Sequence, residues 1–65
     1  MKKVILKEKM PFMYKGTLTW YDIGTEFEVV KEAKLKMIGL CYKVKKYGCI
    51  FDGWRVAKNF EDKNN

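Results

Sequence analysis

The sequence predicts a small all-β domain, and two stretches of alternating side chains separated by turn residues support that prediction. In residues 26–31, Phe27 and Val29 alternate with Glu26 and Glu28, which is the period-two pattern of a strand with one buried face. Residues 40–44 repeat the alternation, and Gly48 follows at a position suited to a hairpin tip. We therefore expect a small antiparallel sheet built from short strands.

The remaining elements follow from composition and turn residues. Lys3–Glu8 is a short β-rich run, and we expect a first strand there. Lys9–Thr17 contains the single proline and a glycine, and is interpreted as a loop. Gly24 can adopt a positive φ in a turn before the strand predicted at Glu26–Lys31.

An α+β fold with a helix near residues 26–38 is the alternative. Thr25 and Glu28 have the spacing of a helix capping box, and the run that follows is rich in good helix formers. The adjacent β-branched residues Val29 and Val30 favour the strand.

Two turns compete after the strand at residues 40–44. A hairpin at Tyr47-Gly48 produces two strands of ordinary length, whereas a type I′ turn at Asp52-Gly53 requires one very long strand. We choose the first turn and interpret Asp52-Gly53 as a bulge.

This choice predicts the state of the two thiols. A turn at Tyr47-Gly48 places Cys49 opposite Lys46 and Cys41 opposite Trp54, so the sulfur atoms lie too far apart for a disulfide. The competing turn also separates them. We predict two free thiols that behave as small, half-buried apolar residues, because the chain has no histidine to generate a thiolate.

Length and composition restrict the organisation and the location of the chain. Its 65 residues suffice for one domain, predicted at residues 1–62, with a flexible C-terminal tail at 63–65. With no histidine and only two cysteines, no zinc site or other cofactor is expected. The apolar run Val4–Leu6 is too short for an export signal or a membrane span. These observations predict a cytoplasmic protein that does not bind membranes.

Two segments carry a resemblance to a known fold family. The segment LTWYDIGTEFEVV at residues 18–30 resembles the turn and following strand of SH3 domains, and RVAKNFED at 55–62 is similar to their short 3₁₀ turn and last strand. Over residues 3–62 the chain resembles small SH3-like proteins of phages and prophages of Gram-positive bacteria. This resemblance implies a five-stranded SH3-like barrel that acts as a non-catalytic binding module.

The chain departs from SH3 domains where those domains bind proline-rich peptides. The loop after the first strand carries three lysines against the single Glu8, although an acidic loop is needed to receive a cationic ligand. Residues 40–42 replace the expected paired tryptophans, and Ala57 replaces the groove proline. These departures argue against a proline-peptide site.

Binding of a protein partner is the function that we expect first. Modulation of a host factor is a further expectation, and it rests on the resemblance. Adjacent strand residues face opposite sides, so only one of Trp20 and Tyr21 can lie inside. The core is expected to contain Phe27, Tyr42, Trp54 and Phe60. The predicted protein-binding residues are Phe12, Met13, Tyr14, Trp20 and Tyr21.

Nucleic-acid binding is the alternative function, because the formal net charge is +6. Lys43 and Lys45 are expected on one side of a strand, with Lys34 and Lys36 in the preceding loop, and Tyr47 or Phe51 exposed for stacking on bases. A Lys-rich solvated surface explains the charge equally well, since 13 of the 14 cations are lysines. The predicted nucleic-acid-binding residues are Lys34, Lys36, Lys43, Lys45, Lys46, Tyr47 and Arg55.

Catalysis is not expected. Without histidine it would depend on lysine, cysteine or a carboxylate pair, and the eight acidic residues are scattered over positions that face outward. The sequence contains no Gly-rich phosphate loop and no nucleophile elbow.

Overall fold

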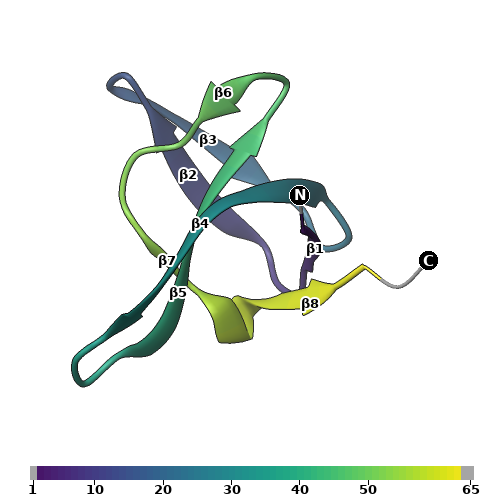
Figure 1. The fold of residues 1–65 in the computed structure, drawn as a ribbon. Helices are drawn as coiled ribbons and strands as arrows, with labels where there is room; N and C mark the ends of the chain where they lie inside the picture. The colour runs from purple at the N-terminus through teal and green to yellow at the C-terminus, as the bar shows by residue number, and fades with distance from the viewer. Residues whose placement is uncertain (1, 64–65) are drawn as a thin grey trace.

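The computed structural model describes residues 2–63, which form eight strands and one short 3₁₀ helix (Figure 1). The elements are β1 (Lys3–Leu6), β2 (Met10–Tyr14), β3 (Thr17–Tyr21), β4 (Glu26–Leu35), β5 (Gly39–Lys46), β6 (Cys49–Ile50), β7 (Arg55–Val56), η1 (Ala57–Asn59) and β8 (Phe60–Asp62). No helix within the described range is long and apolar enough to cross a membrane.

The strands form two antiparallel sheets. One sheet has the order β6-β5-β4-β1-β8, with β7 also paired to β5, and the other is the β2–β3 hairpin alone. The β4–β5 hairpin projects away from the rest of the molecule (Figure 1). The all-β class is therefore confirmed, although the hydrogen-bonded ladders of residues 2–63 do not close into a barrel.

Residues 26–35 are extended, so the alternative helix near residues 26–38 is wrong. Phe27 and Val29 are buried and alternate with the half-exposed Glu26 and Glu28, as predicted. The strand continues four residues beyond the predicted end at Lys31. It does so because β5 pairs with it along its full second half, after a register shift between Val29 and Lys31.

The segment interpreted as a loop, Lys9–Thr17, is instead mostly strand. Met10–Tyr14 pairs with Thr17–Tyr21 through a two-residue turn, in which Lys15 has φ 46° and Gly16 has φ 83°. Two consecutive positive φ values match a type I′ turn, whose twist suits a tight hairpin. The glycine therefore marks the end of a strand instead of a long loop.

The hairpin predicted at Tyr47-Gly48 is confirmed, with Lys46 paired to Cys49. The predicted partner of Cys41 is wrong: Cys41 faces Val56 instead of Trp54. Asp52 and Gly53 lie in an irregular segment between β6 and β7, and not in a bulge of one strand, which shifts the pairing by two residues. Both cysteines are free, as predicted, with Cys41 buried and Cys49 partly buried.

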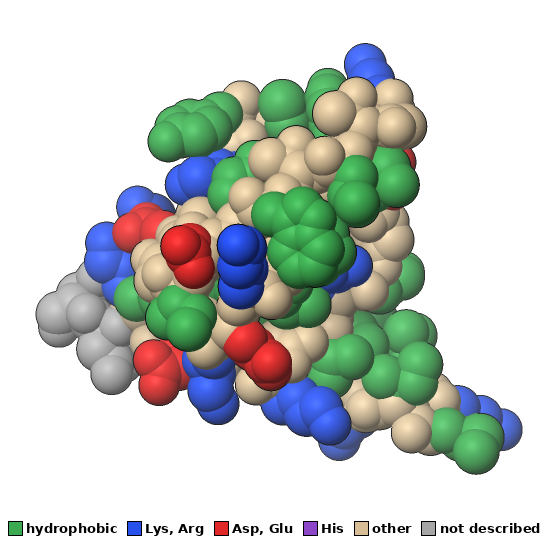
Figure 2. Space-filling model, turned by 180° about the vertical axis from the view of Figure 1, so that it is seen from behind, with side chains coloured by type: hydrophobic (Ala, Val, Ile, Leu, Met, Phe, Trp, Pro, Cys, Tyr) green, Lys and Arg blue, Asp and Glu red, His purple; other side chains and the backbone are tan. Residues whose placement is uncertain are grey.

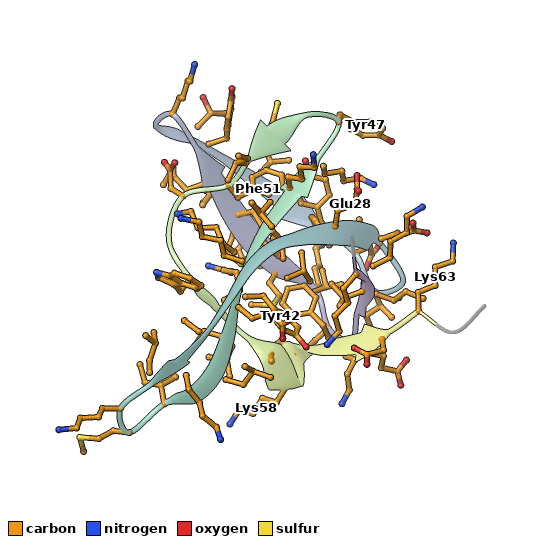
Figure 3. The ribbon with its side chains drawn as sticks, viewed as in Figure 1. Glu28, Tyr42, Tyr47, Phe51, Lys58 and Lys63 are labelled. Atoms are coloured by element: carbon orange, nitrogen blue, oxygen red, sulfur yellow. The ribbon has the colours of Figure 1, made fainter. Side chains whose placement is uncertain are left out.

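Aromatic rings fill the interior between the two sheets. Phe12 lies at the centre, with ring centroids 4.7 Å from Phe27, 5.3 Å from Phe51 and 5.8 Å from Tyr21. The expected core residues Phe27, Tyr42 and Phe60 are buried, but Trp54 is 39% exposed. The side chains of Tyr42 and Phe51 are labelled in Figure 3. The remaining buried apolar residues are Val4, Leu6, Val29, Cys41 and Val44.

The C-terminal part of the described chain is tied to β1. The 3₁₀ turn η1 directly precedes β8, as the sequence predicts. Beyond β8, the Lys63 backbone N–H donates to the Lys3 carbonyl at 3.0 Å, and Lys63 Nζ donates to a Glu26 carboxylate oxygen at 2.8 Å. Of the predicted tail 63–65, Lys63 is thus held in place, and residues 64 and 65 lie outside the described range.

The ion pairs of Glu26 with Lys63 and Lys3 lead us to expect that acid weakens the fold. The hydrogen bond from Lys63, with a smaller effect of Lys3, holds the pKa of the Glu26 carboxyl below its ordinary value of 4.5. Because the pKa of this carboxyl is lower in the folded state than in the unfolded state, its ionised form stabilises the fold at pH values above the unfolded-state pKa. This contribution to stability is lost as the pH falls through the folded-state pKa. We expect Glu26→Gln to reduce the fall in melting temperature below pH 4.5, measured by circular dichroism. Glu8→Gln, at an exposed glutamate, is the control and should leave the acid limb unchanged.

Candidate interaction surface on the β2–β3 hairpin

The β2–β3 hairpin has an inner face in the core and an apolar outer face. Phe12 is 1% exposed, and Tyr14 and Tyr21 are half-buried on the same side. On the other side, Met13 pairs with Leu18 across the hairpin, and Pro11 pairs with Trp20. We call Pro11, Met13, Leu18 and Trp20 the outer face of the hairpin.

The outer face of the hairpin is open to solvent. The exposed fractions are 38% for Met13, 52% for Leu18 and 57% for Trp20. Figure 2 shows the molecule from behind, where several groups of hydrophobic side chains interrupt the charged surface. An apolar ladder on a two-stranded sheet, backed by the core, is the type of surface that protein partners cover.

The predicted protein-binding residues lie at three different locations in the structure. Met13 and Trp20 lie on the outer face, and Tyr14 and Tyr21 line a groove on the inner side. Phe12 is buried, so its prediction as an exposed contact is wrong. Strand alternation explains the error, because a segment interpreted as loop provided no basis for assigning faces.

The groove lies between the β2–β3 hairpin and the β5–β6 hairpin and has a volume of about 150 Å³. Its aromatic walls are Tyr14, Tyr21, Tyr47 and Phe51, and we call it the aromatic groove. Tyr47 stands at the tip of the β5–β6 hairpin, with 89% of its surface exposed (Figure 3). None of the residues that line it is acidic.

Two lysines flank the aromatic groove. Lys46 Nζ donates to the Glu26 carbonyl at 3.0 Å and lies 4.6 Å from the centroid of the Tyr47 ring. Lys15 Nζ lies 5.5 Å from the centroid of the Tyr14 ring. Cations at these distances interact favourably with aromatic faces, so both ammonium groups are held near the groove.

Arg55 is partly buried, and its side chain makes contacts within the protein, so its role in nucleic-acid contact stays a prediction. Its guanidinium donates to the Pro11 carbonyl, and the Cζ atom lies 4.5 Å from the centroid of the Phe12 ring. Burial lowers the pKa of Arg55, and its buried Nε has no hydrogen-bond partner within residues 2–63. The side chain thus connects β7 to β2.

The other predicted nucleic-acid contacts do not share one surface. Lys43 and Lys45 lie on the outward side of β5, opposite Lys31 and Glu28 respectively. Lys34 belongs to β4 and not to a loop, and alternation puts it on the other side of the sheet from Lys31. Lys36 lies in the turn at the end of the projecting hairpin.

The aromatic residues expected to stack on bases are also divided. Phe51 is only 4% exposed, so the expectation that it stacks on bases is wrong, whereas Tyr47 is free to do so. Beside Tyr47 a second hollow of about 340 Å³ contains Lys3 and Lys45 together with Glu26 and Glu28. Charges of both signs weaken its attraction for a polyanion.

Sequence reasoning missed two exposed apolar sites. Leu18 belongs to the outer face of the hairpin, and its pairing with Met13 becomes apparent only once Lys15-Gly16 is identified as a type I′ turn. Met37 and Ile38, at the end of the projecting hairpin, are 103% and 57% exposed. The exposure of these two sites does not follow from hydrophobicity alone, because apolar side chains are expected to be buried.

No known protein family, curated protein or solved structure matches the chain. Within residues 2–63, cysteine, aspartate and glutamate side chains form no group of three or more that could hold a metal ion.

Proposed function

We propose that the protein is a non-catalytic SH3-like binding module that binds a protein partner through its β2–β3 hairpin. The observation that carries the proposal is the outer face of the hairpin, where Met13, Leu18 and Trp20 are exposed side by side. Aromatic residues and methionine are enriched at the centres of protein interfaces.

Three features support the SH3-like part of the proposal. A hairpin follows the first strand, the 3₁₀ turn η1 directly precedes the last strand, and the last strand β8 pairs with the first strand β1. A phage or prophage origin, and modulation of a host factor, rest on the sequence resemblance.

Nucleic-acid binding is the second candidate, and one observation favours it. Lys31 and Lys43 lie directly opposite each other, and Lys45 lies on the same side of β5. Three neighbouring cations can attract phosphates. Glu28, opposite Lys45, reduces the local charge, and Arg55 is engaged internally, so we place this function second.

The proposal is tested by affinity purification from a lysate of the producing cell, with and without nuclease. The matched variants are Trp20→Ser on the outer face and Trp54→Ser, since Trp54 is also a partly exposed tryptophan, at 39%. We expect one protein to be retained by the unmodified chain and by Trp54→Ser, and retention by Trp20→Ser to fall by roughly tenfold or more. Circular dichroism checks that each variant is folded.

Two outcomes contradict the protein-binding proposal. Equal retention by both tryptophan variants would exclude the outer face as the contact. Retention that disappears with nuclease, weakens steeply with salt and is lost in the Lys43→Glu, Lys45→Glu double variant would instead support nucleic-acid binding.

A further inference from the structure

The outward edge of β3 carries backbone groups that no other strand of residues 2–63 pairs with. Tyr14 and Thr17 flank the two-residue turn, so they form a hydrogen-bonded pair of the hairpin. Hydrogen-bonded and non-hydrogen-bonded pairs alternate along an antiparallel ladder, which makes the pair of Met13 with Leu18 a non-hydrogen-bonded one. The pair of Pro11 with Trp20 is of the same kind.

The contacts of β2 agree with this assignment. The Met13 carbonyl accepts a hydrogen bond from the Asp52 N–H at 2.7 Å, and the Pro11 carbonyl accepts one from Arg55, so both groups point away from β3. On the opposite strand, the N–H and C=O groups of Leu18 and Trp20 therefore point away from β2. Within residues 2–63, no strand pairs with that side of β3.

This edge also lacks the charged side chains that normally protect an exposed strand. Proteins prevent unwanted pairing at sheet edges with lysine, glutamate, proline or bulges. For comparison, β8 is an edge strand of the large sheet, and it carries Glu61 and Asp62. The five residues of β3, Thr17–Tyr21, include no charge and no proline. The edge of β3 is thus suited to accept another strand.

The two sides of β3 determine which strand would fit. On the inner side, Thr17, Thr19 and Tyr21 line the aromatic groove, which Lys46 also lines and Lys15 flanks. On the outer side, Leu18 and Trp20 are exposed. Side chains of an added strand would alternate between these sides, so acidic residues would face the lysines and apolar residues would cover the outer face.

We propose that the edge of β3 binds an extended acidic segment of a partner protein as an additional β-strand. The net charge of +6, together with a groove that has no acidic lining residue, favours an acidic strand over a basic one and over a second copy of this chain. The main-chain hydrogen bonds to Leu18 and Trp20 supply pairing, and the alternating side chains supply selectivity. The inference rests on the proposed function and specifies the partner's conformation and charge.

The test uses a short synthetic peptide that alternates valine with glutamate, and a second peptide with lysine in place of glutamate. Isotope-labelled protein is titrated with each peptide and followed by NMR. We expect the glutamate peptide to slow hydrogen exchange of the Leu18 and Trp20 amides, because those protons enter new hydrogen bonds. The lysine peptide should leave both amides unchanged.

The matched variants are Leu18→Pro and Leu18→Val. Proline removes an N–H that the hairpin does not use and is tolerated at an exposed strand edge, whereas valine retains the N–H and an apolar side chain. We expect Leu18→Pro to weaken binding of the glutamate peptide about tenfold and Leu18→Val to preserve it. If Leu18→Pro fails to fold, amide exchange in the unmodified protein decides the question.

Three results would overturn the proposal: no binding of the glutamate peptide, equal binding of both peptides, or binding that leaves the Leu18 and Trp20 amides unprotected. These results are distinguishable from failure of the proposed function. If Trp20→Ser abolishes capture of a cellular protein but Leu18→Pro does not, the outer face binds a partner without strand addition. If neither affects capture, the proposed function fails as well.

Discussion

Replacing Phe12 by alanine is expected to unfold most of the protein. Phe12 is 1% exposed and has ring contacts with Phe27, Phe51, Tyr21 and Phe60. Truncating a buried phenylalanine to alanine costs about 3–5 kcal/mol, because apolar burial is lost and a cavity remains. Since small domains have total stabilities as low as about 5 kcal/mol, this loss can remove the folded state. Urea titration followed by circular dichroism measures the change.

Met13→Ala is the matched control for Phe12→Ala. It alters the neighbouring residue on the same strand, whose side chain lies on the outer face and is 38% exposed. Surface truncation normally changes stability by about 0.5 kcal/mol or less, so we expect a far smaller loss for Met13→Ala than for Phe12→Ala. If Phe12→Ala unfolded cooperatively at a urea concentration close to that for Met13→Ala, the aromatic interior would not be the main source of stability.

Replacing Arg55 by methionine is expected to cost about 1.5 kcal/mol. Methionine retains much of the apolar stem, but it leaves the Pro11 carbonyl without its charged donor and the Phe12 ring without the cation. Hydrogen bonds from charged groups contribute about 1.5–3 kcal/mol, and partial exposure of Arg55 places it at the lower end. The free energy of unfolding from urea titration is the measurement.

Two further variants separate the contributions of Arg55. Arg55→Lys keeps the charge but loses the planar guanidinium, so we expect most of the destabilisation to remain. Lys43→Met removes a cation from the outward side of β5 and should change stability little. If Arg55→Lys were as stable as the unmodified protein, charge alone would explain the contact with β2.

Local patterns predict much of the main sheet. Alternation around Phe27 and Val29 indicates β4, and Tyr47-Gly48 indicates the hairpin between β5 and β6. The separation of the two thiols and the 3₁₀ turn before β8 were also predictable. Each of these features depends on interactions between residues that are close in sequence, or on the period of a strand with one buried face.

The errors arise where distant parts of the chain decide the outcome. Pro11 suggests a loop, but its missing N–H points away from β3, so β2 forms in spite of it. The register shift near Lys31 puts lysines on opposite sides of the sheet, although their spacing in the sequence alone suggests that they share one side. Arg55 resembles a surface cation until β7 and β2 are placed side by side. The outer face and the free edge of β3 therefore required the structure.

The unequal burial of the two thiols has a practical consequence. Cys49 lines the aromatic groove and is partly exposed, whereas Cys41 is a buried residue of β5. A maleimide-linked fluorophore should therefore attach at Cys49 of the folded protein without mutagenesis. Its emission would then report directly on whatever occupies the space between Tyr14 and Tyr47.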